Sequence, residues 1–186
     1  VLYAVVGEEE VKDPEMRWRR TAHGWPWDGI SPGYNQPEQP WGFGRSFFAI
    51  DPATRSVRWH HREDEPADCR AVCMSDGRIY AFRFEEYLVC LEASSGKVLW
   101  RKTPANDPEL FRTIGSLNPR QGWQTNWRTA AYLKCGDRAL YFAGPQVGKL
   151  VAVSAESGDL LWSNDYDNFQ LLLRDDGLYA ISGPWG

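Results

Sequence analysis

Two stretches of the chain concentrate side chains that could bind a flat or ring-shaped ligand. Residues 8–46 and 102–127 combine Trp with Asn, Gln, Asp and Arg. An indole can stack on a planar cofactor or a sugar ring, while the polar side chains hydrogen-bond to the edge of that ring. The candidate binding residues are Trp25, Trp27, Asp28, Trp41, Arg45, Trp123, Asn126 and Trp127.

The same indoles have two other uses. They could pack the long loops onto a folded body, giving each loop a small core of its own. They could also form a protein-interaction surface, because Trp, Tyr and Arg dominate binding hot spots. The residue types alone leave these alternatives open.

A cluster of metal-ligand types occurs near the first third of the chain. The run HHREDE occupies residues 60–65, with Asp68 and Cys69 shortly after it. Adjacent residues of a strand point in opposite directions, so His60 and His61 cannot both bind one ion without a bend. We therefore expect a solvated acidic loop here and no metal site.

The cysteines and the standard catalytic motifs give no catalytic residue. Cys69, Cys73, Cys90 and Cys135 form no CxxC or CxxCH motif, which excludes zinc-ribbon, thioredoxin-type and c-type haem sites. Cys73 and Cys90 lie in apolar runs, where a free thiol packs as a small hydrophobe; a disulfide framework is the alternative. No nucleophile motif or phosphate-binding glycine loop is present.

Composition limits the class of protein. The chain has 186 residues, enough for one domain with a real core, and 42% of them are hydrophobic. No apolar run approaches the roughly 20 residues that a membrane helix needs. The net charge of −4 argues against nucleic acid as a partner.

The elements that must position these side chains form a repeat. Each copy has a short apolar run, a four-residue turn ending at Gly or Arg, and a strand that closes on Trp. The closing residues Trp59 and Trp100 are 41 positions apart, a typical WD40-like blade period, and Trp162 follows after 62. The copies are 49–59, 90–100 and 152–162.

A second repeated unit is a hairpin, with a tight turn such as Asp76-Gly77 between apolar runs. It occurs over 71–82, 131–142 and 171–180, and Val1–Val6 matches its second strand. Together the two units give four short antiparallel strands, A to D, and no stretch longer than one turn has helical periodicity. This pattern predicts an all-β fold, a β-propeller of four-stranded blades; a β-sandwich is the structural alternative.

Residues 1–186 are thus expected to form a partial propeller of about three blades. The expected blades are strands B to D over 1–60, full blades over 70–101 and 128–163, and strands A and B over 169–183. Three blades do not close a ring of four to eight. We therefore expect a segment of a longer protein, whose remaining blades are its partners.

The two Trp-rich insertions are expected on one face. Connections in an up-and-down blade alternate between the two faces, with A–B and C–D turns on one. Insertion 8–46 is a B–C loop and insertion 102–127 is a D–A crossover, so both fall on the other face. Long loops on one face of a rigid scaffold are common binding sites.

The closing segments resemble the signature Ala-x-Asp-x-x-Thr-Gly-x-x-x-Trp of PQQ-like (pyrroloquinoline-quinone-type) β-propellers. Ala49–Trp59 matches it with Arg55 in place of Gly, and the other copies have Glu92 or Ser154 in place of Asp. The resemblance implies that the closing residues Trp59, Trp100 and Trp162 dock neighbouring blades.

The resemblance also implies two classes of function. Quinoprotein dehydrogenases bind the quinone and calcium and oxidise alcohols or sugars, whereas other relatives keep only the scaffold. The adjacent Cys-Cys pair of the dehydrogenases is absent here, and no residue matches their calcium or catalytic set.

We therefore expect a non-catalytic binding or scaffold module for a protein or carbohydrate partner, without cofactor or metal. The alternative is a fragment of a PQQ- and calcium-dependent alcohol or sugar dehydrogenase. The family implies a bacterial protein in the periplasm or outside the cell.

Overall fold

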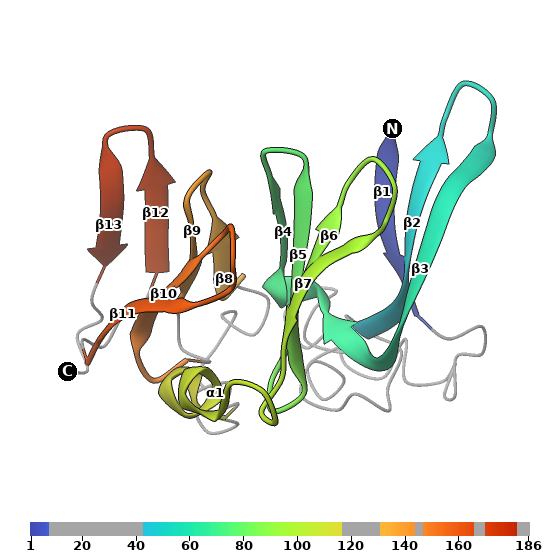
Figure 1. Cartoon of the computed structure of the whole chain (residues 1–186). Coiled ribbons are helices and arrows are strands. Elements are labelled where there is room, and N and C mark those ends of the chain that lie inside the picture. The colour runs from blue at the N-terminus through green and yellow to red at the C-terminus, as the bar shows by residue number, and fades with distance from the viewer. Residues whose placement is uncertain (8–42, 117–130, 144–146, 166–169, 182–186) are drawn as a thin grey trace, which may run out of the picture. The chain divides into compact units, whose positions relative to one another are not determined.

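The computed structural model describes residues 1–7, 43–116, 131–143, 147–165 and 170–181. The chain divides into two compact units, Val1–Cys69 and Arg70–Gly186. Strands of antiparallel sheets form most of the described structure, which confirms the all-β prediction (Figure 1). No helix among these residues is long and apolar enough to cross a bilayer.

The first unit contains a three-stranded sheet. Its strands are β1 (Leu2–Val6), β2 (Phe43–Asp51) and β3 (Ser56–Asp68), in the order β1-β2-β3. This order is that of strands B, C and D of a blade, as the sequence predicts. The β2–β3 turn is held by Asp51, whose Oδ1 accepts from the backbone N–H of Ala53 at 3.0 Å.

The expectation of a solvated acidic loop at residues 60–68 is wrong, because β3 continues through Asp68. Glu63 and Asp68 are buried at 3% and 1% exposure. His61 Nε2 lies 2.6 Å from Glu63 Oε1, and His60 stacks on Phe48 with ring centroids 4.4 Å apart. Pairing with β2 orders this segment, and the local pattern of charges gave no sign of it.

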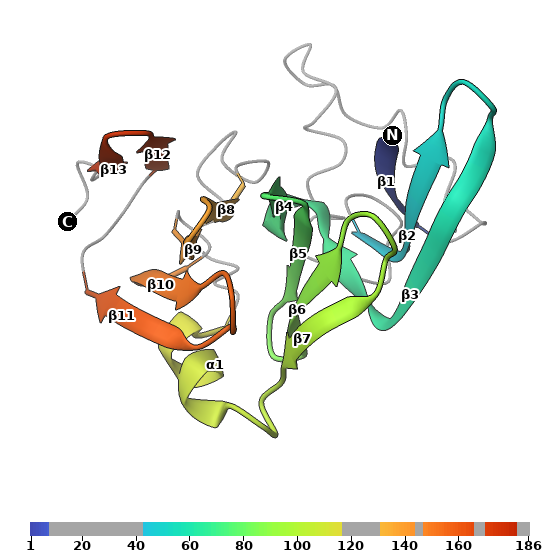
Figure 2. The same ribbon diagram turned by 45° about the horizontal axis from the view of Figure 1, so that its top comes forward.

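The second unit contains two four-stranded sheets and a hairpin (Figure 2). In sequence order the first sheet has β4 (Val72–Ser75), β5 (Arg78–Arg83), β6 (Tyr87–Glu92) and β7 (Val98–Lys102). The second has β8 (Leu133–Cys135), β9 (Ala139–Phe142), β10 (Leu150–Ser154) and β11 (Leu160–Asn164). The hairpin has β12 (Gln170–Arg174) and β13 (Gly177–Ile181). A 3-10 turn over Cys69–Ala71 precedes β4.

Sequential pairing within each of these sheets gives the meander of a propeller blade. The Asp76-Gly77 turn between β4 and β5 has φ of 44° and 69°, the left-handed backbone that a two-residue hairpin requires. The A–B and C–D turns of this unit lie at one end of the strands, and helix α1 (Pro108–Ile114) lies at the other (Figure 1).

Helix α1 lies within insertion 102–127, although no stretch of the sequence longer than one turn has helical periodicity. Asp107 caps it by accepting from the backbone N–H of Leu110 at 3.2 Å, and Pro108 stands in its first turn. The seven-residue helix is too short to show periodicity, but the Asp-Pro pair is a start signal that could have revealed it. Its apolar side belongs to the core, so this part of the insertion serves packing.

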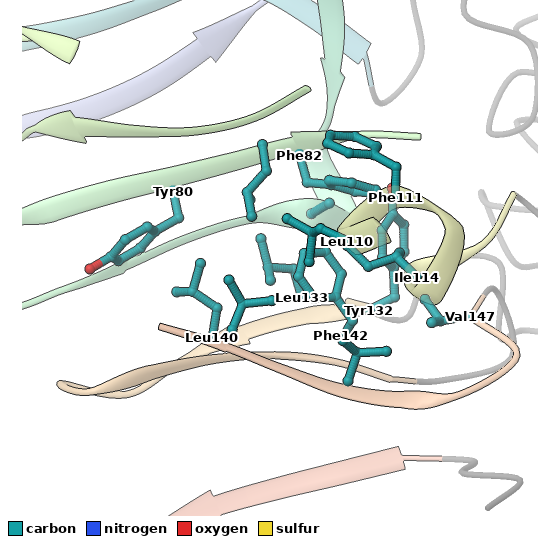
Figure 3. Close-up of a cluster of buried hydrophobic side chains, with 14 of the residues drawn as sticks. Tyr80, Phe82, Leu110, Phe111, Ile114, Tyr132, Leu133, Leu140, Phe142 and Val147 are labelled. Atoms are coloured by element: carbon teal, nitrogen blue, oxygen red, sulfur yellow. The ribbon is translucent and has the colours of Figure 1, made fainter. Parts of the chain in front are cut away.

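The main core of the second unit lies between its two four-stranded sheets and α1 (Figure 3). Phe82 of β5 and Phe142 of β9 meet edge to face with centroids 4.9 Å apart. Leu110, Phe111 and Ile114 of α1 close one end of this cluster. The sheets are therefore joined by apolar burial, the dominant favourable term in folding.

Candidate functional site

The predicted binding face falls almost wholly outside the described residues. Only Arg45, on β2, is described: its Nη2 lies 3.9 Å from Glu65 Oε2 on β3, and both side chains are partly exposed. The binding role of this ion pair and of the other candidates stays a prediction. The candidates outside the described residues are Trp25, Trp27, Asp28, Trp41, Trp123, Asn126 and Trp127.

The three closing tryptophans occupy one repeated arrangement in their sheets. In each, the Trp on the last strand is opposite a small residue on the middle strand, which is opposite a Tyr. Directly opposite residues share a face, so the two rings meet over the small side chain. The rows are Tyr3–Ala49–Trp59, Tyr80–Cys90–Trp100 and Tyr141–Ala152–Trp162, with ring centroids 6.0, 6.0 and 6.3 Å apart.

A bulge precedes each closing Trp. The register shifts by one residue between Ala49 and Ile50, between Cys90 and Leu91, and between Ala152 and Val153. The extra residue on the last strand is Arg58, Leu99 or Leu161, and all three are exposed. A bulge turns the following side chain and disrupts the strand edge, which places the indole over the sheet and protects the edge from pairing.

Trp100 extends this arrangement to the next sheet. Its indole Nε1 donates a hydrogen bond to the backbone carbonyl of Ala155 at 3.2 Å, in the turn between β10 and β11. A Cβ added to Gly158 in that turn would lie 2.7 Å from Trp100 Cζ3. The turn therefore receives the indole only because position 158 is glycine.

The carbonyl of Ala155 accepts from two further side chains of the first sheet. The Tyr80 hydroxyl lies 3.3 Å from the oxygen and Arg78 Nη1 lies 3.2 Å from it. Burial raises the pKa of Tyr80 to about 12, so this hydroxyl remains a donor at neutral pH. Ala155 is fully buried, and its backbone carbonyl makes these three contacts. Any small side chain at position 155 would therefore allow them.

An ion pair borders this contact. Lys102 Nζ lies 2.6 Å from Asp159 Oδ1 and 3.3 Å from Asp107 Oδ2. The hydrogen bond to Asp159 is the main cause that raises the pKa of Lys102, and it lowers the pKa of Asp159. The pair links β7 to the turn after β10.

Sequence reasoning identified Trp100 but missed its partners. Two signals were available: a Tyr at the same place in each hairpin unit, and an Ala followed three residues later by Gly in the second and third turns. The sequence does not say that these groups meet, because they lie on different sheets and 55 to 77 residues apart. The described residues contain no group of three His, Cys, Asp or Glu arranged to hold a metal ion.

Comparison with known families identifies the repeat. Residues 46–109 match the family described as outer membrane protein assembly factor BamB, which has PQQ-type repeats. The resemblance to PQQ-like β-propellers is confirmed. The matched segment contains β4 to β7 with Trp100, and it begins within β2.

Several solved structures are similar in part. BamB from Moraxella catarrhalis is 18% identical with a TM-score of 0.49, covering 75% of this chain and 42% of that protein. A europium-containing methanol dehydrogenase is 15% identical with a TM-score of 0.43, covering 65% and 22%. The quinohemoprotein alcohol dehydrogenase from Comamonas testosteroni is 18% identical with a TM-score of 0.41, covering 66% and 19%.

The chain thus spans less than half the length of each of these three proteins. No curated protein matches it in sequence.

Proposed function

We propose that this chain is a non-catalytic PQQ-like β-propeller module that acts as a scaffold for a protein partner. The observation that supports this most directly is the family match, whose description is that of an outer membrane protein assembly factor. A partner of that kind would be another component of outer-membrane protein assembly, and the location would be the bacterial periplasm.

The side chains of the described blades agree with a scaffold role. Trp100, Tyr80 and Arg78 all donate to Ala155, so groups that could hydrogen-bond a ligand are used between sheets. We propose that Trp59 and Trp162, which occupy equivalent rows, dock blades wherever a turn like that of Ala155 and Gly158 receives their indole. The remaining candidates for partner binding are then the two insertions and the Arg45–Glu65 edge of β2 and β3.

A quinoprotein dehydrogenase is the second candidate function, favoured by the alcohol-oxidising enzymes among the similar structures. Among the residues that the structure describes, no three His, Cys, Asp or Glu side chains are grouped so that they could hold a metal ion. A carbohydrate ligand stacked on the Trp-rich insertions is a further proposal, based on residue types alone.

A Trp-fluorescence titration with pyrroloquinoline quinone, with and without calcium, separates scaffold from dehydrogenase. We expect no saturable quenching in either condition. Saturable, calcium-dependent quenching would overturn the scaffold proposal and lead to a dye-coupled screen of alcohols and sugars.

Site-specific photocrosslinking in the cell envelope tests the partner. A photoreactive residue at position 123 or 27 is expected to give one discrete adduct whose mass spectrum identifies an outer-membrane assembly component. The control position is Leu99, which is 44% exposed on the bulge of β7. Equal adducts from position 99, or none from the insertions, would contradict the proposal.

The substitutions Trp25→Ala and Trp123→Ala, each made with the photoreactive residue at position 27, distinguish binding from loop packing. Loss of the adduct at an unchanged melting temperature indicates a binding surface. A lower melting temperature with the adduct retained indicates that these indoles pack the loops, and would remove them from the proposed partner surface.

A further inference from the structure

Two cysteines of the second unit lie on the facing sides of its two four-stranded sheets. Cys73 on β4 is opposite Tyr80, and both belong to the row that ends at Trp100. Because residues of one row share a face and Trp100 contacts the next sheet, the Cys73 side chain is on the face that meets that sheet. Cys135 on β8 is opposite Leu140, whose side chain is in the core between the sheets. Both thiols pack against that core.

Two hydrogen bonds fix the alignment of β4 and β8 on either side of these cysteines. The N–H of Tyr132 donates to the carbonyl of Arg70 at 3.0 Å, and Ser75 Oγ donates to Asp137 Oδ1 at 2.9 Å. Ser75 and Asp137 are 62 residues apart, and the other bonded pair has the same offset. Cys73 and Cys135 are separated by the same number of residues as these two bonded pairs. The two cysteines therefore occupy matching positions on strands β4 and β8, which lie side by side (Figure 2).

The spacing of the two strands suits a covalent link. A backbone hydrogen bond such as that between Tyr132 and Arg70 joins chains about 5 Å apart, like neighbouring strands of a sheet. A disulfide spans Cα atoms about 4.4–6.8 Å apart. The other two thiols are placed elsewhere: Cys90 is buried two strands away from Cys73, and Cys69 is exposed before β4.

The two thiols already interact. A hydrogen bond between them lowers the pKa of Cys135, and the same bond together with burial raises the pKa of Cys73. The thiolate is the attacking species in thiol–disulfide exchange, so Cys135 is the first nucleophile. Neither side chain is fully buried, so a small disulfide reagent has access.

We propose that Cys73 and Cys135 form a reversible disulfide that links the first strands, β4 and β8, of two successive four-stranded sheets. The oxidant is a small-molecule or protein disulfide. The Cys135 thiolate attacks one sulfur of that disulfide, forms a mixed disulfide and releases one thiolate. Cys73, once deprotonated, then attacks the Cys135 sulfur and releases the second thiolate. The protein dithiol loses two electrons and two protons, and the reagent becomes two thiols. This inference does not depend on the proposed function.

The test is equilibration of the full chain in oxidised and reduced glutathione, followed by alkylation of the remaining thiols and peptide mapping. We expect a cross-linked peptide pair containing Cys73 and Cys135, with Cys69 and Cys90 alkylated. The oxidised protein should melt about 5–10 °C higher than the reduced protein, because the link closes a long loop between the sheets.

Three single variants make the result specific. Cys73→Ser should stop at a glutathione adduct on Cys135, while Cys69→Ser and Cys90→Ala should keep both the cross-link and the melting shift. If Cys90→Ala fails to fold, the peptide map of the unsubstituted chain decides the question. Alkylation of both Cys73 and Cys135 after oxidation, or a persistent glutathione adduct without cross-link in the unsubstituted chain, would overturn the proposal.

Discussion

Trp100 and Trp162 have the same local setting and different surroundings. Each closes its sheet after a bulge and meets a Tyr over a small residue. Trp100 is half-buried against the turn of the next sheet, whereas Trp162 is 43% exposed in the described structure. The contact between Tyr and Trp therefore depends on one sheet alone. Docking depends instead on the turn of the next sheet, which receives the indole.

The cores on the two sides of the β8–β11 sheet differ in the same way. The face toward β4–β7 contributes to the large cluster that contains Phe82 and Phe142. The face toward β12–β13 has a small cluster around Leu171, and the Lys134 ammonium donates to the carbonyl of that residue. We expect the stability of the second unit to come mainly from the first of these interfaces.

The largest expected effect tests that difference between the cores. Phe142→Ala should lower the free energy of unfolding by about 4 kcal/mol, because Phe142 is fully buried among aromatic rings. Leu171→Ala, in the small cluster on the face toward β12–β13, should cost about 2 kcal/mol. Urea denaturation measures both, and similar losses would contradict the ranking of the two interfaces.

The second effect isolates the glycine of the receiving turn. Gly158→Ala should cost about 3 kcal/mol, because the new Cβ meets the Trp100 ring and the backbone has φ of 77°. Gly77→Ala is the matched control, with φ of 69° and nothing within 4 Å of the added Cβ. It should cost only about 1 kcal/mol. Equal costs would show that backbone strain, not contact with Trp100, determines the result.

A smaller effect concerns the equivalent turn of the three-stranded sheet, between β2 and β3. Arg55 has φ of 56° where Gly96 and Gly158 stand in the other copies. Arg55→Gly should stabilise the first unit by about 0.5 kcal/mol, since the relief of left-handed strain slightly exceeds the entropy cost of glycine. Arg55→Ala removes the same charge but keeps a Cβ, so thermal denaturation should show no gain for it.

The smallest effect concerns the ion pair beside Trp100. Lys102 lowers the pKa of Asp159, so the stabilisation is present above the unfolded-state pKa of about 3.9 and disappears as pH falls through the lower folded-state pKa. Asp159→Asn should therefore melt below the unsubstituted protein at pH 7 and match it at about pH 2. Asp165→Asn, which removes the partner of Lys149, is the control for loss of an exposed carboxylate. A difference that persists at the lower pH would contradict this assignment.

The repeat made most of the fold predictable. The repeated Trp-closed segments and hairpin turns predicted the strand order, because most of the strand pairings join residues close in sequence. Helix α1 was missed because its seven residues are stabilised by burial of Leu110 and Ile114 more than by local pattern. The strand at 60–68 was missed because partners on β2 decide its conformation.

The candidate site was predictable only in part. The indole of Trp100 follows from the repeat, but the convergence of Tyr80, Arg78 and Trp100 on one carbonyl requires the packing of two sheets. The facing thiols of Cys73 and Cys135 depend on the same packing. The sequence favoured a free thiol at Cys73 over a disulfide, because the offset of 62 residues between the two cysteines has no local signature.

The central claim is that Trp100 joins two successive sheets while Trp162, in the same local row, does not do so within the described structure. Urea denaturation of Trp100→Phe and Trp162→Phe tests it most directly. Trp100→Phe should lose about 2 kcal/mol, from the hydrogen bond to Ala155 and the contact with Gly158, and Trp162→Phe about 0.5 kcal/mol or less. Equal losses, or a larger loss for Trp162→Phe, would contradict the account.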